Sequence, residues 1–183
     1  MCYWLYKILS PISRVWLERV EGLEHVPKGA VIFAPNHPSY LDGVLLFYLV
    51  NWRLKRHIHF FTWKLWWSWI YIPMVHGITL GGAVAKGIDT LKRGISLGVF
   101  PEGGRTFGKL RPFKTGVATL ALLTGKPIVP VDIVYLRQKA MRWKAIVRFG
   151  KPIRVKTYKG ERVPLAFRRQ ITKRLREEIS LLR

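Results

Sequence analysis

Residues 30–42 read AVIFAPNHPSYLD, and the rest of the chain can be interpreted outward from this stretch. Ala30–Ala34 are all apolar, and a short apolar run that ends at a proline predicts a buried β-strand. The next four residues, Asn36–Ser39, form a turn whose serine is expected to cap a helix running to about Val50. Asp42 would then lie in the first helical turn, in an arrangement like a capping box. A strand, a polar turn and a helix in this order are typical of open α/β folds, which place ligand sites at such turns.

Further strands and helices alternate on the C-terminal side of this stretch, which predicts an α/β domain. Strands are expected at His57–Thr62, Ile95–Phe100, Pro127–Val134 and Ala145–Phe149. Helices are expected at Val84–Arg93 and Lys114–Thr124, each followed by a glycine, and along the C-terminal apolar stripe of Phe167, Ile171, Leu175, Ile179 and Leu182.

Two segments have the composition of membrane-contacting elements. Met1–Val20 has apolar residues at helical spacing and is interrupted by Pro11, so it predicts a broken amphipathic helix that packs on the core or anchors at a membrane interface. Leu65–Ala85 contains no charged residue and is long enough to span a bilayer. Because proline and glycines interrupt it, a buried or surface-inserting helix followed by a strand is favoured over a span.

The composition indicates the kind of partner rather than the fold. The 183 residues, 49% of them hydrophobic, suffice for one core, and 32 Lys+Arg against 10 Asp+Glu give a net charge of +22. Such an excess favours nucleic acid, an anionic lipid surface or phosphorylated ligands. Eight tryptophans suit a membrane interface or stacking on single-stranded nucleic acid. Cys2 is the single cysteine, which fits a reducing compartment, and no secretory signal is expected.

His37 is the first candidate for chemistry. If the helix begins after Ser39, the Asp42 carboxylate can reach back to one imidazole nitrogen, fix the tautomer and leave the other nitrogen free to take a proton. That pair can activate a hydroxyl. The alternative is that Asp42 only caps the helix and His37 is a surface turn residue. No Gly-x-Ser-x-Gly nucleophile motif is present, so the attacking group would be a substrate hydroxyl or water.

Residues 100–106, FPEGGRT, form a second polar loop after a predicted strand. Glycines let backbone N–H groups approach a ligand closely, and Arg105 can bind phosphate or carboxylate through two parallel hydrogen bonds. Glu102 would orient that arginine or accept bonds from ligand hydroxyls. A glycine-rich turn with a surface Glu–Arg pair is the alternative. His57 and His59 have no cysteine or carboxylate cluster beside them, which favours positions in the sheet over a metal site.

Taken together, the two loops resemble motifs of the glycerolipid acyltransferase family, which includes the lysophosphatidic acid acyltransferases. The first family motif, Asn-His-x-x-x-x-Asp, is matched by Asn36, His37 and Asp42. The third, usually Phe-Pro-Glu-Gly-Thr-Arg-Ser, is matched by residues 100–106. Phe113-Lys114-Thr115-Gly116 and Pro127-Ile128-Val129-Pro130-Val131 extend the resemblance, which covers roughly residues 22–134.

The chain departs from the family pattern at two places. Gly104 stands where the third motif usually has threonine. In many members the second motif carries an arginine thought to help hold the acceptor phosphate, whereas residues 77–82 read GITLGG here. Lys64 resembles the lysine that precedes that segment in the family. These departures bear on the acceptor head group rather than on the base.

The resemblance implies a single α/β domain, a mixed sheet flanked by helices with an N-terminal membrane-facing helical element. Residues 1–183 would form one acyltransferase domain. Within it, residues 1–21 would be the amphipathic helical element, 22–134 the motif-bearing core and 135–183 the C-terminal strands and basic helix.

The resemblance also implies a reaction, fatty acyl transfer from acyl-CoA or acyl-carrier protein to a lysolipid hydroxyl. The first-choice acceptor is lysophosphatidic acid, giving phosphatidic acid in phospholipid biosynthesis. His37 would remove the hydroxyl proton and Asp42 would orient His37. The acceptor would be bound by Glu102, Gly103, Gly104 and Arg105. No metal or bound cofactor is expected. The partners would be the lysolipid, the thioester donor and an anionic membrane surface on the cytoplasmic face, with peripheral or monotopic attachment.

Other functions remain open at this point. The acceptor could be another lipid alcohol, or water could replace it in a membrane-bound hydrolase. The chain could also be a catalytically silent lipid-binding relative. A non-enzymatic membrane- or nucleic-acid-binding protein would account for the charge and the aromatic residues. It would leave both motifs unexplained, however, and no nucleic-acid partner is expected.

Overall fold

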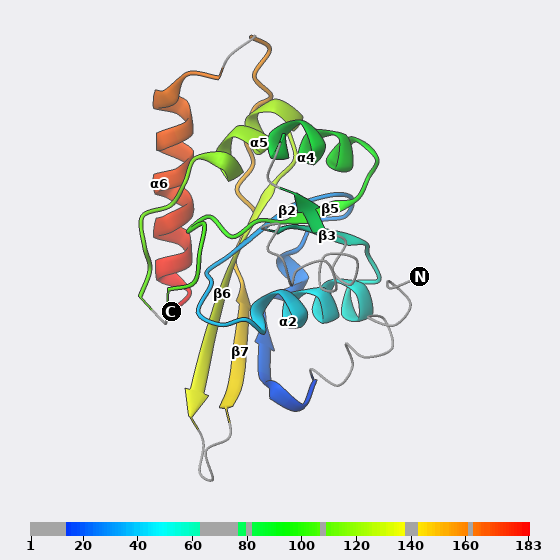
Figure 1. The fold of residues 1–183 in the computed structure, drawn as a ribbon, viewed down its shortest axis with the longest axis vertical. Helices are drawn as coiled ribbons and strands as arrows, with labels where there is room; N and C mark the ends of the chain where they lie inside the picture. Colours follow the sequence, from blue (N-terminus) through cyan, green and yellow to red (C-terminus); the bar gives the residue numbers. More distant parts are fainter. Residues whose placement is uncertain (1–13, 63–76, 80–81, 107–108, 138–142, 161–162) are drawn as a thin grey trace.

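The computed structural model describes residues 14–62, 77–79, 82–106, 109–137, 143–160 and 163–183 (Figure 1). The strands are β1 (Leu17–Glu21), β2 (Ile32–Pro35), β3 (Ile58–Thr62), β4 (Gly77–Thr79), β5 (Ser96–Gly98), β6 (Ile128–Arg137) and β7 (Trp143–Phe149). The helices are α2 (Asp42–Tyr48), α4 (Ala83–Lys92), α5 (Gly116–Thr124) and α6 (Leu165–Leu181), with a 3₁₀ turn η2 (Leu23–His25) and a π-helical turn η3 (Leu49–Arg53) after α2.

The strands of these residues form one mixed sheet in the order β1-β7-β6-β2-β5-β3-β4. β6, β2, β5, β3 and β4 run parallel to one another, whereas β7 is antiparallel to β6 and β1 is parallel to β7. β2 therefore lies inside the sheet, and all four of its residues are buried. A strand covered on both faces reads as a continuous apolar run, which explains the sequence AVIFA.

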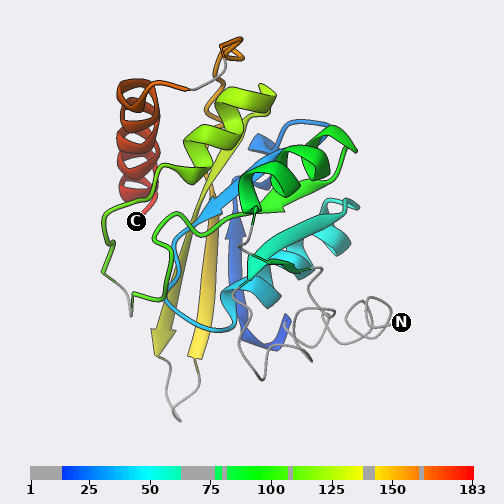
Figure 2. The same ribbon diagram turned by 45° about the horizontal axis from the view of Figure 1, so that its top comes forward.

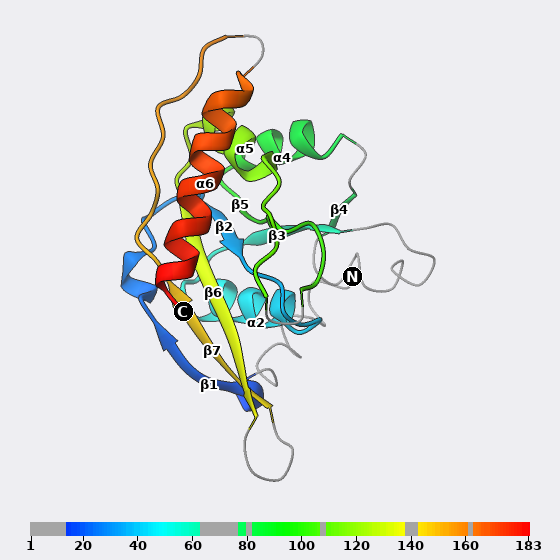
Figure 3. The same ribbon diagram turned by 90° about the vertical axis from the view of Figure 1, so that its left-hand side faces the viewer.

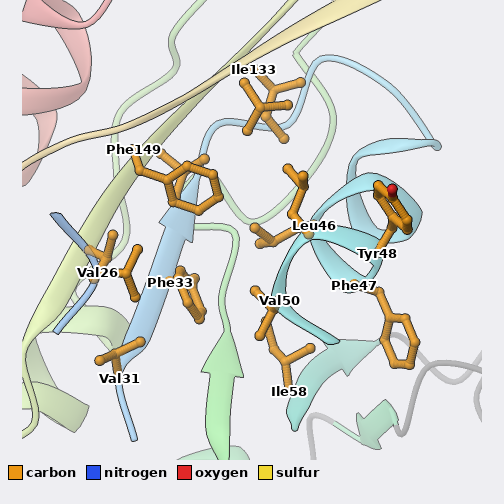
Figure 4. Packing of buried hydrophobic residues seen from close by; sticks show 14 of the residues in the cluster. Val26, Val31, Phe33, Leu46, Phe47, Tyr48, Val50, Ile58, Ile133 and Phe149 are labelled. Atoms are coloured by element: carbon orange, nitrogen blue, oxygen red, sulfur yellow. The ribbon is translucent and has the colours of Figure 1, made fainter. Parts of the chain in front are cut away.

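Helices cover both faces of the sheet, so the chain forms a three-layer α/β domain (Figures 1 and 2). One face packs against α2 and η3, through a core that includes Phe33, Leu46 and Phe149 (Figure 4). The opposite face packs against α4, α5 and α6, through a core that includes Ile32 and Leu97. Successive residues of β2 enter opposite cores because side chains alternate along a strand. The expected α/β fold with a mixed sheet is confirmed.

The helix expected over Met1–Val20 is wrong at its C-terminal end. Leu17–Glu21 form β1, an edge strand whose Leu17 pairs with Ala145 and whose Val20 pairs with Val147 of β7 (Figure 3). Backbone hydrogen bonds to a strand more than a hundred residues away override the local helical spacing. Residues 1–13 lie outside the described residues, and so does the expected N-terminal membrane element.

The apolar segment Leu65–Ala85 lies only partly within the described residues. Its end contains β4 and the start of α4, which agrees with the expected strand, while its first part and Lys64 are not described. Among the helices of the described residues, none combines the length and apolar character needed to cross a bilayer.

α2 begins at Asp42, three residues later than the expected cap at Ser39. One of the two contacts of the expected box is present, and the Ser39 hydroxyl accepts from Leu41 instead of from Asp42. The Ser39 backbone N–H donates to Asp42 Oδ2 at 2.8 Å, and the Leu41 N–H donates to Ser39 Oγ at 3.3 Å. This local geometry turns the Asp42 side chain back toward the end of β2.

Candidate active site

His37 and Asp42 meet at the carboxyl end of β2. The His37 Nδ1 atom lies 2.7 Å from Asp42 Oδ2, so the contact expected from the sequence is present. Because an ionised carboxylate only accepts hydrogen bonds, Nδ1 carries the proton and Nε2 keeps its lone pair. The imidazole stacks on Phe100 with ring centroids 4.0 Å apart, and 19% of its side chain is exposed. The ring is thus held in one orientation while an edge stays accessible.

Tyr135 provides a further hydrogen-bond donor to the Asp42 carboxylate. Its hydroxyl donates to Asp42 Oδ1 at 2.8 Å, while His37 and the Ser39 N–H occupy Oδ2. Asp42 is fully buried. Burial first, and the Asp42 charge second, raise the pKa of Tyr135 far above its ordinary value, so the phenol remains a donor. No local sequence pattern points to Tyr135, because only the register of β6 brings it beside α2.

Asn36 locks the end of β2 to β6. Its Nδ2 group donates to Asp132 Oδ1 and to the Ile133 carbonyl, both at 3.0 Å, and its Oδ1 accepts from the Ile133 N–H at 2.7 Å. Asn36 and Asp132 are buried, so each of these bonds is sheltered from water. Asn36, the asparagine of the first motif, therefore anchors the backbone directly before His37, and its side chain does not serve to contact a ligand.

Asp132 in turn joins this lock to two cations. Arg148 Nη1 and Arg183 Nε each lie 3.4 Å from an Asp132 carboxylate oxygen, and Arg148 also pairs with Glu21 at 3.1 Å. Burial raises the pKa of Asp132, and the two arginines oppose that rise. The network links β1, β7 and Arg183 to the start of the turn that carries His37.

Glu102 connects the two motifs through backbone groups. Its Oε1 accepts the His37 N–H at 3.0 Å and its Oε2 accepts the Arg111 N–H at 3.1 Å, and only 6% of the residue is exposed. The Thr106 N–H also donates to the His37 carbonyl at 3.0 Å. Because β2 and β5 are adjacent parallel strands, their carboxyl ends bring these two loops together.

Arg105 lies over the ring of Tyr40, with its guanidinium carbon 3.3 Å from the ring centroid. Tyr40 belongs to the turn between His37 and Asp42, so a cation is placed on the same loop as the imidazole. Gly103 has φ +68°, and a Cβ atom there would come within 2.7 Å of Lys114 Nζ. Gly104 has open space where a Cβ would stand.

A cavity of about 260 Å³ opens beside His37. Its walls come from β3, α4, α5 and the loop after β5, and most of them are apolar. The lining residues are His37, Phe61, Ala83, Val84, Val99, Phe100, Pro101, Gly103, Gly104, Lys114, Gly116, Val117 and Leu120. The predicted residues His37, Gly103 and Gly104 thus share one cavity, whereas Asp42 and Glu102 support it from behind. Within the described part of the chain no cluster of His, Cys, Asp or Glu suits a metal ion.

A mixed α/β sheet with a His–Asp pair at the end of a central strand and a glycine-rich loop beside it defines a class of protein. A family model described as "Acyltransferase" matches residues 18–134, more than half of the chain. The chain belongs to the acyltransferase family.

Two curated proteins are among those similar to this chain. The chain is 31% identical over 134 residues to a 1-acyl-sn-glycerol-3-phosphate acyltransferase of Borreliella burgdorferi, covering 62% of this chain and 50% of that protein. It is 28% identical over 135 residues to the chloroplastic 1-acyl-sn-glycerol-3-phosphate acyltransferase BAT2 of Brassica napus, covering 63% and 36%. The chain thus spans half or less of the length of these curated relatives.

A solved structure extends the likeness to the whole fold. The crystal structure of the 1-acyl-sn-glycerophosphate (LPA) acyltransferase PlsC from Thermotoga maritima superposes with a TM-score of 0.71 at 25% sequence identity. The superposition covers 98% of this chain and 77% of that one.

Proposed function

We propose that this protein transfers a fatty acyl group from a thioester to the hydroxyl of a lysolipid, with lysophosphatidic acid as the first-choice acceptor. The observation that carries the proposal is the His37–Asp42 pair, held by Tyr135 at the edge of an apolar cavity within the two family motifs. The names of the similar proteins support the same acceptor. The donor is acyl-CoA or acyl-carrier protein.

The proposed chemistry needs one base and no protein nucleophile. The Nε2 atom of His37 takes the proton of the acceptor hydroxyl, and the oxygen attacks the thioester carbonyl. The new C–O bond forms, the C–S bond breaks, and the imidazolium returns its proton to the departing thiolate. Asp42 stabilises the imidazolium and keeps the tautomer, while Tyr135 and Ser39 hold Asp42 in place.

The apolar cavity suits the acyl chain of the donor. Its walls of Phe61, Val99, Val117 and Leu120 bury hydrocarbon, while His37 lies on the same lining. A chain in this cavity would leave its thioester near the imidazole. Gly103 and Gly104 would let that group approach the backbone closely.

The acceptor head group is assigned to the Arg105 side of the turn. Stacking on Tyr40 holds the guanidinium beside the His37 loop, and Lys114 supplies a second cation against Gly103. In this arrangement Glu102 contributes indirectly, because its carboxylate holds the backbone of His37. A charge-assisted bond to phosphate contributes about 1.5–3 kcal/mol, or roughly 10- to 150-fold in a binding constant.

The base is tested by His37→Ala in a turnover assay with acyl-CoA and lysophosphatidic acid. We expect a fall in kcat of about 10²- to 10⁴-fold, typical of a lost general base, in a protein that remains folded. Asp42→Asn should also lower kcat, by a smaller factor. Near-normal turnover by a folded His37→Ala protein would refute the mechanism, and thioester hydrolysis that ignores lysolipid would identify a hydrolase.

The head-group assignment is tested by Arg105→Ala with phosphate-bearing and neutral acceptors. The KM for the phosphate acceptor should rise while kcat/KM for a neutral lipid alcohol stays nearly constant. Equal losses on both acceptors would mean that Arg105 is structural, and the phosphate assignment would be withdrawn.

We also propose peripheral or monotopic attachment to an anionic membrane on its cytoplasmic face. The net charge of +22 and the eight tryptophans support it. Each Lys or Arg near such a surface contributes about 1 kcal/mol, screened by salt.

A further inference from the structure

The β6–β7 hairpin extends beyond the active-site end of the sheet. Pro35, the last residue of β2, pairs with Val131, yet β6 continues for six more residues to Arg137, which pairs with Trp143. At roughly 3.4 Å per residue this extension is about 20 Å long. Figures 1 and 3 show the hairpin projecting away from the helices.

The outer part of this hairpin is apolar and cationic. Leu136 is 43% exposed and Trp143 is 52% exposed, and they pair in register with Lys144 and Arg137. Val15, 64% exposed, lies at the same end, because Leu17 two residues later pairs with Ala145 of β7. We call this set the hairpin patch: Val15, Leu136, Arg137, Trp143 and Lys144. The patch combines exposed apolar side chains with cationic ones and contains no acidic residue. This composition suits the interface of an anionic bilayer.

The register of the hairpin relates the patch to the catalytic groups. Tyr135 contacts Asp42, and Arg137 and Trp143 lie on the same face of the hairpin two residues further out, about 7 Å along the strand. The headgroup layer of a bilayer is roughly 5–8 Å thick on each side. A patch seated in that layer would therefore place Tyr135, which contacts Asp42 of the His37–Asp42 pair, near the outer edge of the headgroups.

We propose that the hairpin patch docks into the headgroup layer of an anionic bilayer and so presents the active-site end of the sheet to an acceptor lipid lying in that layer. The docking stands on the exposure, charge and position of the patch. The presentation of an acceptor rests on the proposed function. The patch contains no residue of Leu65–Ala85, the uncharged segment that the sequence suggested for membrane contact.

The docking is tested by sedimentation of the full chain with vesicles of phosphatidylcholine and phosphatidylglycerol. The double variant Leu136→Ala, Trp143→Ala should bind at least about tenfold more weakly, and Arg137→Gln about fivefold more weakly. The matched control is Phe167→Ala, which removes an exposed ring of similar accessibility from α6, far from the hairpin. Equal affinity of the wild type and the double variant, or an equal loss in the control, would overturn the docking.

Fluorescence gives a readout that does not depend on activity. Trp143→Phe keeps an apolar ring but removes one indole, so quenching by vesicles with bromine-labelled acyl chains should fall in this variant. An unchanged quenching profile would overturn the docking. So would a Trp143→Ala variant that binds vesicles normally but has lost affinity for single-stranded RNA, because the patch would then be a nucleic-acid surface.

Kinetics test the second half of the proposal. In the double variant, kcat/KM for lysophosphatidic acid embedded in vesicles should fall about as far as vesicle affinity, while kcat/KM for a short-chain acceptor dissolved as monomers should stay constant. Equal losses on both acceptors would overturn the presentation role. If the wild type transfers no acyl group at all, the proposed function fails, and sedimentation and quenching still decide the docking.

Discussion

The hydroxyl of Tyr135 offers a test of how His37, the proposed base, is held in place. Tyr135→Phe removes the bond to Asp42 Oδ1 and leaves that oxygen buried without its donor, since Asp42 has no exposed surface. A hydrogen bond to a charged group contributes about 1.5–3 kcal/mol, so the free energy of unfolding at pH 7 should fall by about that amount. Asp42 keeps its contacts to His37 and Ser39, so kcat should fall by roughly tenfold, much less than in His37→Ala.

The assay combines urea unfolding with turnover at saturating acceptor. Tyr48→Phe is the control, because Tyr48 is a buried tyrosine on α2 (Figure 4). It should change kcat little. If Tyr135→Phe has wild-type kcat and wild-type stability, the carboxylate needs no third donor and the reasoning about its orientation is refuted.

The same variant makes a prediction about pH. Burial and then the Asp42 charge raise the pKa of Tyr135 in the folded state, whereas an unfolded tyrosine loses its proton near pH 10. Above about pH 10 the unfolded chain therefore binds fewer protons at this site than the folded chain. The contribution to the free energy of unfolding is complete below pH 10 and is lost by up to about 1.4 kcal/mol per pH unit above it. The stability gap between the wild type and Tyr135→Phe should thus narrow from pH 10 to 11, and a constant gap would contradict the assigned shift.

Three further variants test the loops around His37. Asn36→Ala removes three buried hydrogen bonds between the end of β2 and β6. The free energy of unfolding, measured in urea, should fall by roughly 2–4 kcal/mol. A loss below about 1 kcal/mol would argue that Asn36 does not hold the two strands together. Gly103→Ala should cost at least about 1 kcal/mol and lower kcat, because a side chain is strained at φ +68° and the end of the Lys114 side chain would have to move. Gly104→Thr, which has open space for its side chain, should leave the thermal midpoint unchanged; equal destabilisation of both glycine variants would contradict this difference.

The parts of the fold and the site that could be predicted are those encoded by neighbours in sequence. The run AVIFA, the cap around Ser39 and the return of Asp42 to His37 depend on residues within a few positions of one another. β1 could not be predicted, since Leu17 and Val20 fit a helical stripe as well as an edge strand, and the choice depends on β7.

Tyr135 and Glu102 illustrate the contacts that could not be predicted from the sequence. The partner of Tyr135 follows from the pairing of β2 with β6, which no local pattern reveals. Glu102 was expected to face Arg105 or a ligand, but its two oxygens accept backbone N–H groups. Backbone donors carry no sequence signature, so a carboxylate that binds them cannot be distinguished in sequence from one that binds substrate.

The way Glu102 holds its loop has a consequence for how specificity can diverge. Because its carboxylate accepts only the main-chain N–H groups of His37 and Arg111, an exposed side chain of either loop can be exchanged while both hydrogen bonds remain. Tyr40 and Gly104 lie in such exchangeable positions, one exposed and the other facing open space. A library randomised at these two positions should therefore yield folded proteins, and their turnover on different lysolipids would show whether these positions set the proposed acceptor choice.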